Sequence, residues 1–166
     1  MVVFFQGCRR SCPWCFNPGT HPFEDRLLYT VEGLFTSHPA DDVEGITVSG
    51  GEPFLQSEGL FRLVSAAKNH RLSTVVYTGF AYEELLVRED FARVLPFIDV
   101  LVDGAYDWAR PEGTLLARGS TNQRFHFLTG RYSILDFYMP GRAEIIIGPG
   151  GVVKGTGFSR IPFTLS

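Results

Sequence analysis

The residues with the clearest chemical potential are three cysteines spaced as Cys8-x3-Cys12-x2-Cys15, and the chain has no others. Cysteines so close together cannot join distant parts of a fold, so we do not expect a disulfide framework. Closed structural zinc and iron–sulfur sites take four protein ligands. Three thiolates therefore predict a [4Fe–4S] cluster with one iron open to another molecule. The alternative is a Cys3His zinc site completed by His21, although its spacing fits no common zinc finger.

A second motif, Gly50-Gly51-Glu52-Pro53, follows a short apolar strand. Ligands of parallel α/β folds bind at the carboxyl ends of strands, and paired glycines let the backbone approach a ligand closely. Thr78-Gly79 and Asp103-Gly104 end two later strands and are expected on the same rim. Taken alone, each of these segments is equally well explained as a plain turn.

The spacing of the cysteines, with Trp14 at the aromatic position, resembles the C-x3-C-x-Φ-C signature of the radical S-adenosylmethionine (SAM) superfamily, and the second motif resembles its GGEP segment. The resemblance implies that the open iron chelates SAM and that electron transfer yields a 5′-deoxyadenosyl radical, which removes a hydrogen atom from the substrate. It implies Cys8, Cys12 and Cys15 as cluster ligands. The SAM contacts that we predict are Trp14, Phe16, Gly50, Gly51, Glu52, Pro53, Thr78, Gly79, Asp103 and Asn122.

The stretch from Arg118 to Arg124 (RGSTNQR) and the strand end Leu101–Gly104 (LVDG) resemble the activating proteins of anaerobic ribonucleotide reductase. This resemblance implies removal of a glycine Cα hydrogen from a glycyl-radical enzyme, the large reductase subunit, with flavodoxin or ferredoxin as electron donor. The amides of Asn122 and Gln123 either order the SAM ribose or the incoming peptide, or cap a turn. The alternatives are a radical SAM enzyme acting on another peptide or small molecule, and a non-catalytic metal-binding adaptor.

The elements that must position these residues follow from hydrophobic periodicity. Strands are predicted at 2–5, 45–49, 73–78 and 98–103, and helices at 30–35, 55–70 and 81–95. Alternating strands and helices indicate an α/β fold with a parallel sheet. A full (β/α) barrel needs about 200 residues or more, so we expect a partial TIM-like barrel of the radical SAM type with an added C-terminal β-hairpin over 144–158.

The chain has 166 residues and a net charge of −3, with a pI near 5.8. This length fits a single radical SAM domain over 1–166, with a motif-bearing β/α core at 1–104 and an irregular segment and hairpin at 105–166. The charge gives no electrostatic reason to expect nucleic acid or a membrane surface as a partner. No apolar run reaches the ~18–20 residues that span a bilayer, and we expect the cytoplasm as the compartment.

Overall fold

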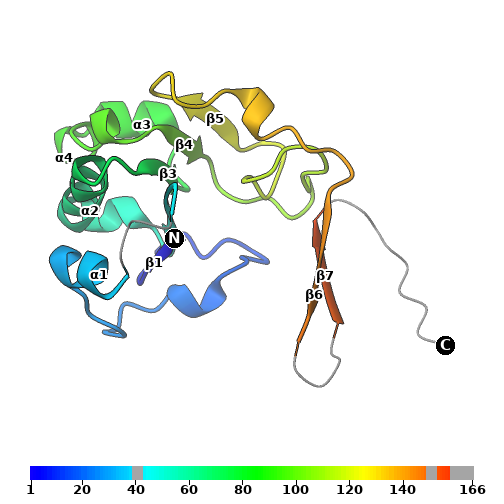
Figure 1. Cartoon of the computed structure of the whole chain (residues 1–166), viewed down its shortest axis with the longest axis horizontal. Coiled ribbons are helices and arrows are strands. Elements are labelled where there is room, and N and C mark those ends of the chain that lie inside the picture. Colours follow the sequence, from blue (N-terminus) through cyan, green and yellow to red (C-terminus); the bar gives the residue numbers. More distant parts are fainter. Residues whose placement is uncertain (39–42, 149–152, 158–166) are drawn as a thin grey trace.

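The computed structural model describes residues 1–38, 43–148 and 153–157. Its main sheet has the order β1-β2-β3-β4-β5 (Figure 1). Its strands are β1 (Val2–Phe5), β2 (Gly45–Gly50), β3 (Ser73–Tyr77), β4 (Val100–Asp103) and β5 (Arg124–Phe127). The first four strands are parallel, and β5 runs antiparallel to β4. The α/β class is therefore confirmed as an open, mostly parallel sheet, while a partial barrel stays a prediction.

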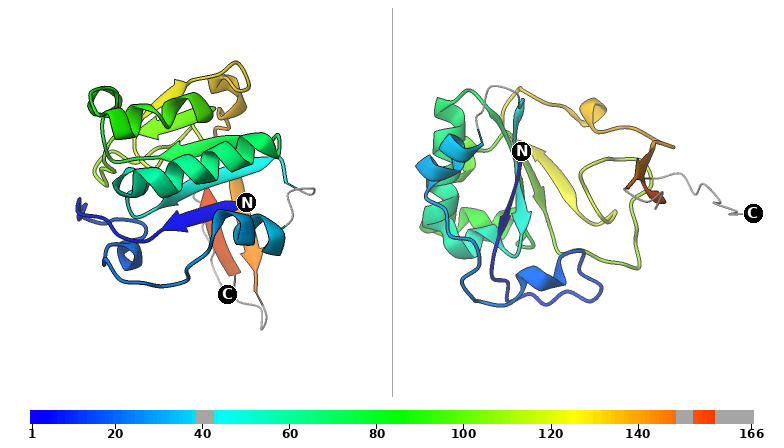
Figure 2. Two further views of the ribbon diagram at one scale, coloured as in Figure 1. Left: turned by 90° about the vertical axis from the view of Figure 1, so that its left-hand side faces the viewer. Right: turned by 60° about the horizontal axis from the view of Figure 1, so that its bottom comes forward.

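The helices lie on one face of this sheet, as Figure 2 shows most clearly in its right-hand view. They are α1 (Val31–Ser37), α2 (Ser57–Asn69), α3 (Tyr82–Leu86) and α4 (Glu89–Ala92). Thr30 caps α1 as predicted, because its hydroxyl accepts a hydrogen bond from Gly33 N at 3.0 Å. None of the helices in the described residues is long and apolar enough to cross a bilayer.

The core fills the space between the helices and the sheet. Side chains alternate along a strand, so Ile46 and Val48 of β2 face the helices and are buried, while Thr47 and Ser49 face the opposite side, where they line a cavity. The buried residues of α2 and its neighbours complete the core, among them Leu60, Leu63, Val64, Leu85 and Phe91. One face of the sheet is thus used for stability, and the other is available for a site.

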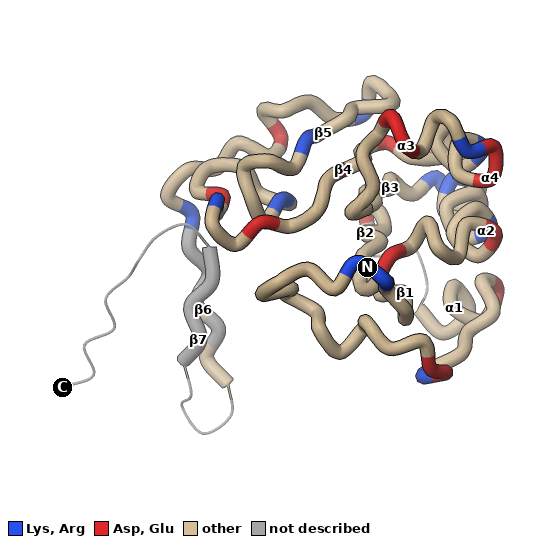
Figure 3. The backbone as a smooth tube through the Cα atoms, turned by 180° about the vertical axis from the view of Figure 1, so that it is seen from behind, with Lys and Arg blue, Asp and Glu red and all other residues tan. Residues whose placement is uncertain are grey.

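The helix predicted over 81–95 is wrong as a single element, because the chain forms α3, α4 and a 3-10 turn at Leu95–Phe97. Arg88 has extended backbone angles (φ −108°, ψ 114°) that interrupt the helix, and its guanidinium lies over the Phe91 ring at 3.6 Å. Charged residues of both signs lie along α2, and the two acidic residues of α4 lie between Arg88 and Arg93 (Figure 3).

The C-terminal hairpin forms from β6 (Ala143–Ile147) and β7 (Val153–Gly157), which pair antiparallel in a sheet of their own. The strand pairing confirms the predicted hairpin, while residues 149–151 of its predicted turn lie outside the described residues. The hairpin extends no edge of the main sheet. The short strand β5 was not predicted at all.

Candidate active site

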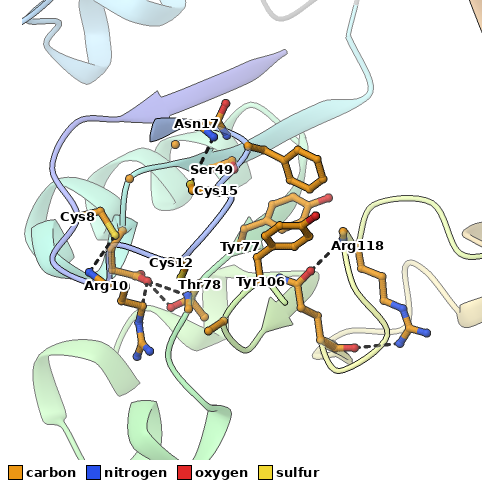
Figure 4. A pocket seen from close by; sticks show the side chains of 18 of the residues that line it. Cys8, Arg10, Cys12, Cys15, Asn17, Ser49, Tyr77, Thr78, Tyr106 and Arg118 are labelled. Carbon is orange, nitrogen blue, oxygen red and sulfur yellow. Dashed lines mark hydrogen bonds and ion pairs between the residues drawn. The ribbon is translucent and has the colours of Figure 1, made fainter. Parts of the chain in front are cut away.

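The candidate site is a cavity of about 670 Å³ between the cysteine segment, the carboxyl ends of the parallel strands and the segment 104–123. Its volume lies in the range of small-molecule pockets, roughly 300–1,000 Å³. Nine of the thirteen predicted site residues line it, namely Cys8, Cys12, Cys15, Phe16, Gly50, Gly51, Glu52, Thr78 and Gly79. Trp14, Pro53, Asp103 and Asn122 do not. Figure 4 shows the three cysteines on one side of this cavity.

The cysteine segment is a loop whose two ends are fastened together. Gly7 N donates to Thr20 O at 2.8 Å and Cys8 N donates to His21 O at 3.0 Å. Within the loop, Ser11 and Trp14 adopt left-handed backbone angles (φ 46° and 60°) that few side chains favour. The loop is therefore a closed unit that turns its thiols toward the cavity.

Backbone amides already point at two of the sulfurs. Arg10 N donates to Cys8 Sγ and Asn17 N donates to Cys15 Sγ, both at 3.4 Å. Burial, together with the neighbouring Cys15 and Cys8 thiols, raises the pKa of the Cys12 thiol. Three sulfurs that share one environment, two of which accept amide hydrogen bonds, fit the thiolate ligands of an iron–sulfur cluster, whose potential depends on such bonds.

The zinc alternative would use His21 as a fourth ligand. His21 lines the same cavity as the three cysteines. Within the ranges that the structure describes, however, no three His, Cys, Asp or Glu side chains are placed to hold a single metal ion.

The paired glycines of the second motif serve backbone packing. A Cβ on Gly50, which has φ +101°, would lie 2.5 Å from Phe5 O, and a Cβ on Gly51 would lie 2.3 Å from Gly7 O. Gly51 N donates to Phe5 O at 2.7 Å. The glycines thus bring the end of β2 against the start of the cysteine loop, which places the two motifs in contact.

Glu52 joins two strand ends inside the cavity wall. Its side chain is 2% exposed, and its carboxylate accepts from Thr78 Oγ1 at 2.8 Å, Gly79 N at 2.8 Å and Phe54 N at 3.2 Å. Burial raises the pKa of this carboxyl, although these hydrogen bonds act in the opposite direction. Glu52 therefore holds the ends of β2 and β3 together at the site.

Two of the residues outside the cavity have other surroundings. Trp14 is 75% exposed and lies 6.0 Å from Trp108, ring centroid to ring centroid. Pro53 is buried at the start of a 3-10 turn that leads into α2.

Asp103 is completely buried in a polar network that joins β4 to its neighbours. Its carboxylate accepts from Tyr82 N at 2.7 Å and from Arg124 Nε at 3.0 Å. Burial acts to raise the pKa of Asp103, but the hydrogen bonds from Arg124 and Tyr82 outweigh it and hold that pKa below its usual range. This carboxylate fixes α3 and β5 beside β4, and the cavity is lined by the adjacent Gly104 rather than by Asp103 itself.

The two amides of the 118–124 segment brace the cavity wall. Gln123 Oε1 accepts from Gly119 N at 2.9 Å and from Ser120 N at 3.2 Å, while its Nε2 donates to Gly104 O at 3.1 Å. Asn122 Nδ2 donates to Ala105 O at 2.7 Å. Asn122 Oδ1 is buried without a hydrogen-bond partner among the described residues. Gln123 thus caps the turn that precedes it, whereas Asn122 joins this segment to Ala105, and the predicted SAM contact of Asn122 stays a prediction.

Several lining residues were not predicted, among them Arg10, Ser49, Tyr77, Tyr106 and Arg118. Ser49 and Tyr77 lie on the open face of the sheet, and burial raises the pKa of Tyr77 to about 12. The Tyr106 ring packs on Phe16 at 4.5 Å between centroids. Strand alternation was a usable signal for Ser49 and Tyr77, since both lie on the face opposite the buried core residues. The sequence carried no comparable signal for Arg10 or Tyr106.

Residues 1–126 match the family model described as a 4Fe-4S single cluster domain. This range contains every predicted site residue. The match covers most of the 166-residue chain.

Individual relatives point to a narrower group. The chain is 30% identical over 136 residues to the anaerobic ribonucleoside-triphosphate reductase-activating protein of Haemophilus influenzae, covering 75% of this chain and 85% of that protein. It is 30% identical over 131 residues to the protein of the same name from Enterobacteria phage T4, covering 75% and 81%. The pyruvate formate-lyase-activating enzyme of Clostridium pasteurianum is 35% identical over 99 residues, covering 54% of this chain and 42% of that enzyme.

The family relationship and the donor set of the cavity agree on the cofactors, which are a [4Fe–4S] cluster and SAM. The chain is accordingly an oxidoreductase. It belongs to the 4Fe-4S single cluster domain family and, within it, to the radical SAM activating enzymes represented by the anaerobic ribonucleoside-triphosphate reductase-activating proteins.

Proposed function

We propose that this chain activates a glycyl-radical enzyme, anaerobic ribonucleotide reductase, by removing a hydrogen atom from a glycine Cα of its partner. When bound together, the cluster and SAM supply the 5′-deoxyadenosyl radical that such a step requires. We assign Cys8, Cys12 and Cys15 as the cluster ligands. The observation that best supports the proposal is that these thiols share one cavity with Gly51, Glu52 and Thr78 at the adjoining strand ends.

The chain's own residues would prepare this cavity in three ways. The amides of Arg10 and Asn17 stabilise negative charge on the Cys8 and Cys15 sulfurs. Glu52 and Thr78 hold the strand ends where we place SAM. The Phe16–Tyr106 contact closes the side between the cysteine loop and the segment 104–123.

The one-sided arrangement of helices favours a large substrate. A primary-carbon radical must be kept from water, and the sheet face that carries the cavity has no helix over it in the described residues (Figure 2). A protein substrate that docks over the opening would supply the missing cover. We propose a single radical SAM domain over 1–166 and a flavodoxin or ferredoxin as the electron donor.

The test uses the anaerobically reconstituted protein with SAM, dithionite and the anaerobic reductase of the same organism. We expect 5′-deoxyadenosine and a glycyl-radical signal by electron spin resonance. Each of Cys8→Ala, Cys12→Ala and Cys15→Ala should abolish both, because a ligand of the cluster is lost. A reductase whose radical glycine is replaced by alanine serves as the control and should give no glycyl signal.

The outcomes separate the alternatives. Formation of 5′-deoxyadenosine without a radical on any glycyl-radical enzyme tested would indicate a different substrate. Purified protein that holds zinc and cleaves no SAM would indicate a metal-binding adaptor. Full activity in any of the three cysteine variants would contradict the ligand assignment.

A further inference from the structure

Arg10 is the residue that connects the cysteine loop to the strand ends. Its backbone N donates to Cys8 Sγ at 3.4 Å. Its side chain leaves the loop, lines the cavity and reaches the segment that follows β3 (Figure 4). One residue thus contacts both halves of the candidate site.

The Arg10 guanidinium, which belongs to the cysteine loop, has three neighbours outside that loop. It lies over the Phe80 ring at 4.3 Å from the centroid, within the range of a cation–π interaction. Its Nε lies 3.9 Å from Glu52 Oε2, and its Nη2 lies 3.8 Å from Glu84 Oε2. Its Nε is buried and has no hydrogen-bond partner among the described residues. The contact is therefore one of charge and shape rather than of direct hydrogen bonds.

Gly79 provides the space that this side chain needs. A Cβ on Gly79 would lie 2.3 Å from Arg10 Cδ and 2.7 Å from Arg10 Nε. Contacts this short force the arginine to move. Gly79 thus has two roles: its N–H donates to Glu52, and its lack of a side chain leaves room for Arg10.

The positive charge of Arg10 lies where it can stabilise the buried carboxylate of Glu52. Its carboxylate is buried, and its hydrogen bonds go to Phe54, Thr78 and Gly79. A buried carboxylate is stabilised by a nearby cation, and removal of that cation leaves its charge uncompensated. The cation that faces Glu52 among the described ion pairs is Arg10.

We propose that Arg10 is a positioning residue, which holds the loop of the three thiols against Glu52 and Gly79 and so sets the affinity of the site for SAM. The inference rests on the proposed assignment of the cluster to the cysteines and of SAM to the strand ends. It assigns a role to a residue that neither motif contains as a fixed position.

The experiment compares Arg10→Gln, Arg10→Lys, Arg10→Ala, Gly79→Ala and the double variant Arg10→Ala/Gly79→Ala with the unchanged protein, each reconstituted anaerobically. Arg9→Gln is the matched control, because it removes the same charge from an exposed neighbour whose ring contact is with Phe23 at 5.4 Å. Three quantities are measured for each protein: iron content, the dissociation constant of SAM, and the change that SAM causes in the spin resonance spectrum of the reduced cluster.

We expect every variant to bind iron like the unchanged protein. Arg10→Gln and Gly79→Ala should weaken SAM binding about tenfold, within the range of coupling between linked sites, and should reduce the spectral change. Arg10→Lys keeps the charge without the planar group over Phe80 and should recover part of the affinity. In the Arg10→Ala background, Gly79→Ala should add little, because the side chain that it displaces is gone.

Arg10→Gln with unchanged SAM affinity would overturn the inference, as would loss of iron in that variant or effects of Arg10→Ala and Gly79→Ala that simply add. An equal loss of SAM affinity in Arg9→Gln would also overturn it, because the effect would then depend on the charge of the loop and not on the position of Arg10. If the unchanged protein binds neither iron nor SAM, the proposed function itself fails, and with it the role of Arg10.

Discussion

At the scale of single residues, the glycines of the strand-end motif have a purpose that ligand approach does not explain. Gly50 and Gly51 lie where any side chain would strike the backbone at Phe5 and Gly7. Their hydrogen, in place of a Cβ, lets the cysteine loop begin directly beside the end of β2. The motif is needed for assembly of the site before any ligand arrives.

We predict that Gly51→Ala weakens SAM binding by about tenfold or more, because its Cβ would lie 2.3 Å from Gly7 O and must push the two segments apart. Iron content should fall less, since the fastened ends of the cysteine loop are untouched. Titration calorimetry of the reconstituted protein measures the affinity. Unchanged affinity for SAM would show that Gly51 is not needed to form the SAM site.

Gly59→Ala is the matched control for this substitution. Gly59 lies in α2, and its Cβ would meet no atom closer than Phe5 Cε1 at 3.9 Å. Alanine is favoured over glycine inside a helix by roughly 0.5–1 kcal/mol. The control should therefore be slightly more stable than the unchanged protein and bind SAM equally well.

At the scale of elements, the segment 104–123 acts as a wall because Gln123 satisfies three backbone groups at once. Arg118 adds a hydrogen bond to Gln123 O at 2.9 Å and an ion pair with Glu112. Burial acts to raise the pKa of Glu112, but hydrogen bonds from Thr114, Arg118 and their neighbours outweigh it and bring that pKa to about 2. An irregular segment is thereby held in one shape without regular secondary structure.

We predict that Gln123→Met destabilises the protein by about 1–3 kcal/mol, since the apolar side chain of similar size leaves two N–H groups and one carbonyl unpaired. Urea denaturation measures the change. Thr121→Ala in the same segment is the control, because its exposed hydroxyl donates only one long hydrogen bond of 3.4 Å to Arg110 O. A stability loss no greater than that of the control would show that the wall is held by other contacts.

The sequence predicted most of these elements because their signals are local. Apolar runs marked β1 to β4, Thr30 marked the start of α1, and the cysteine spacing marked the loop. The break between α3 and α4 contains no glycine or proline that would have predicted it. It coincides with the packing of Arg88 on Phe91. The strand β5 is only four residues long, and its pairing with β4 is a tertiary contact.

The site was predictable to the same degree. The three cysteines and the residues Gly50 to Glu52 carry their chemistry in type and spacing, and they do meet in one cavity. The roles of Asp103 and Arg10 could not be predicted from residue type and spacing, because they depend on contacts with distant parts of the chain. The partners of Asp103 include Arg124, and those of Arg10 include Glu52, which are far away in the sequence.

At the scale of the whole molecule, the hairpin of β6 and β7 stands apart from the sheet that carries the site (Figure 1). Its main contacts are between its own two strands. Tyr138 and Met139, just before it, do contact the segment 114–116 and belong with the wall. The boundary between site and appendage thus falls after Arg142.

We predict that a chain ending at Arg142 keeps its iron and its SAM cleavage, with a melting temperature within about 4 °C of the full chain, equivalent to about 1 kcal/mol. Calorimetry and iron analysis measure this. Leu60→Ala in the fully buried core is the positive control and should cost about 2–5 kcal/mol. Loss of iron in the shortened chain would place the hairpin among the supports of the site.

The pairing of Trp14 with Trp108 has a practical consequence. These are the two tryptophans of the chain, and one belongs to the cysteine loop while the other belongs to the opposite wall. The tryptophan fluorescence of the unlabelled protein therefore originates at the junction of these two parts. We expect this emission to change if loss of the cluster separates the cysteine loop from the segment 104–123, which can be followed in real time with no dye attached.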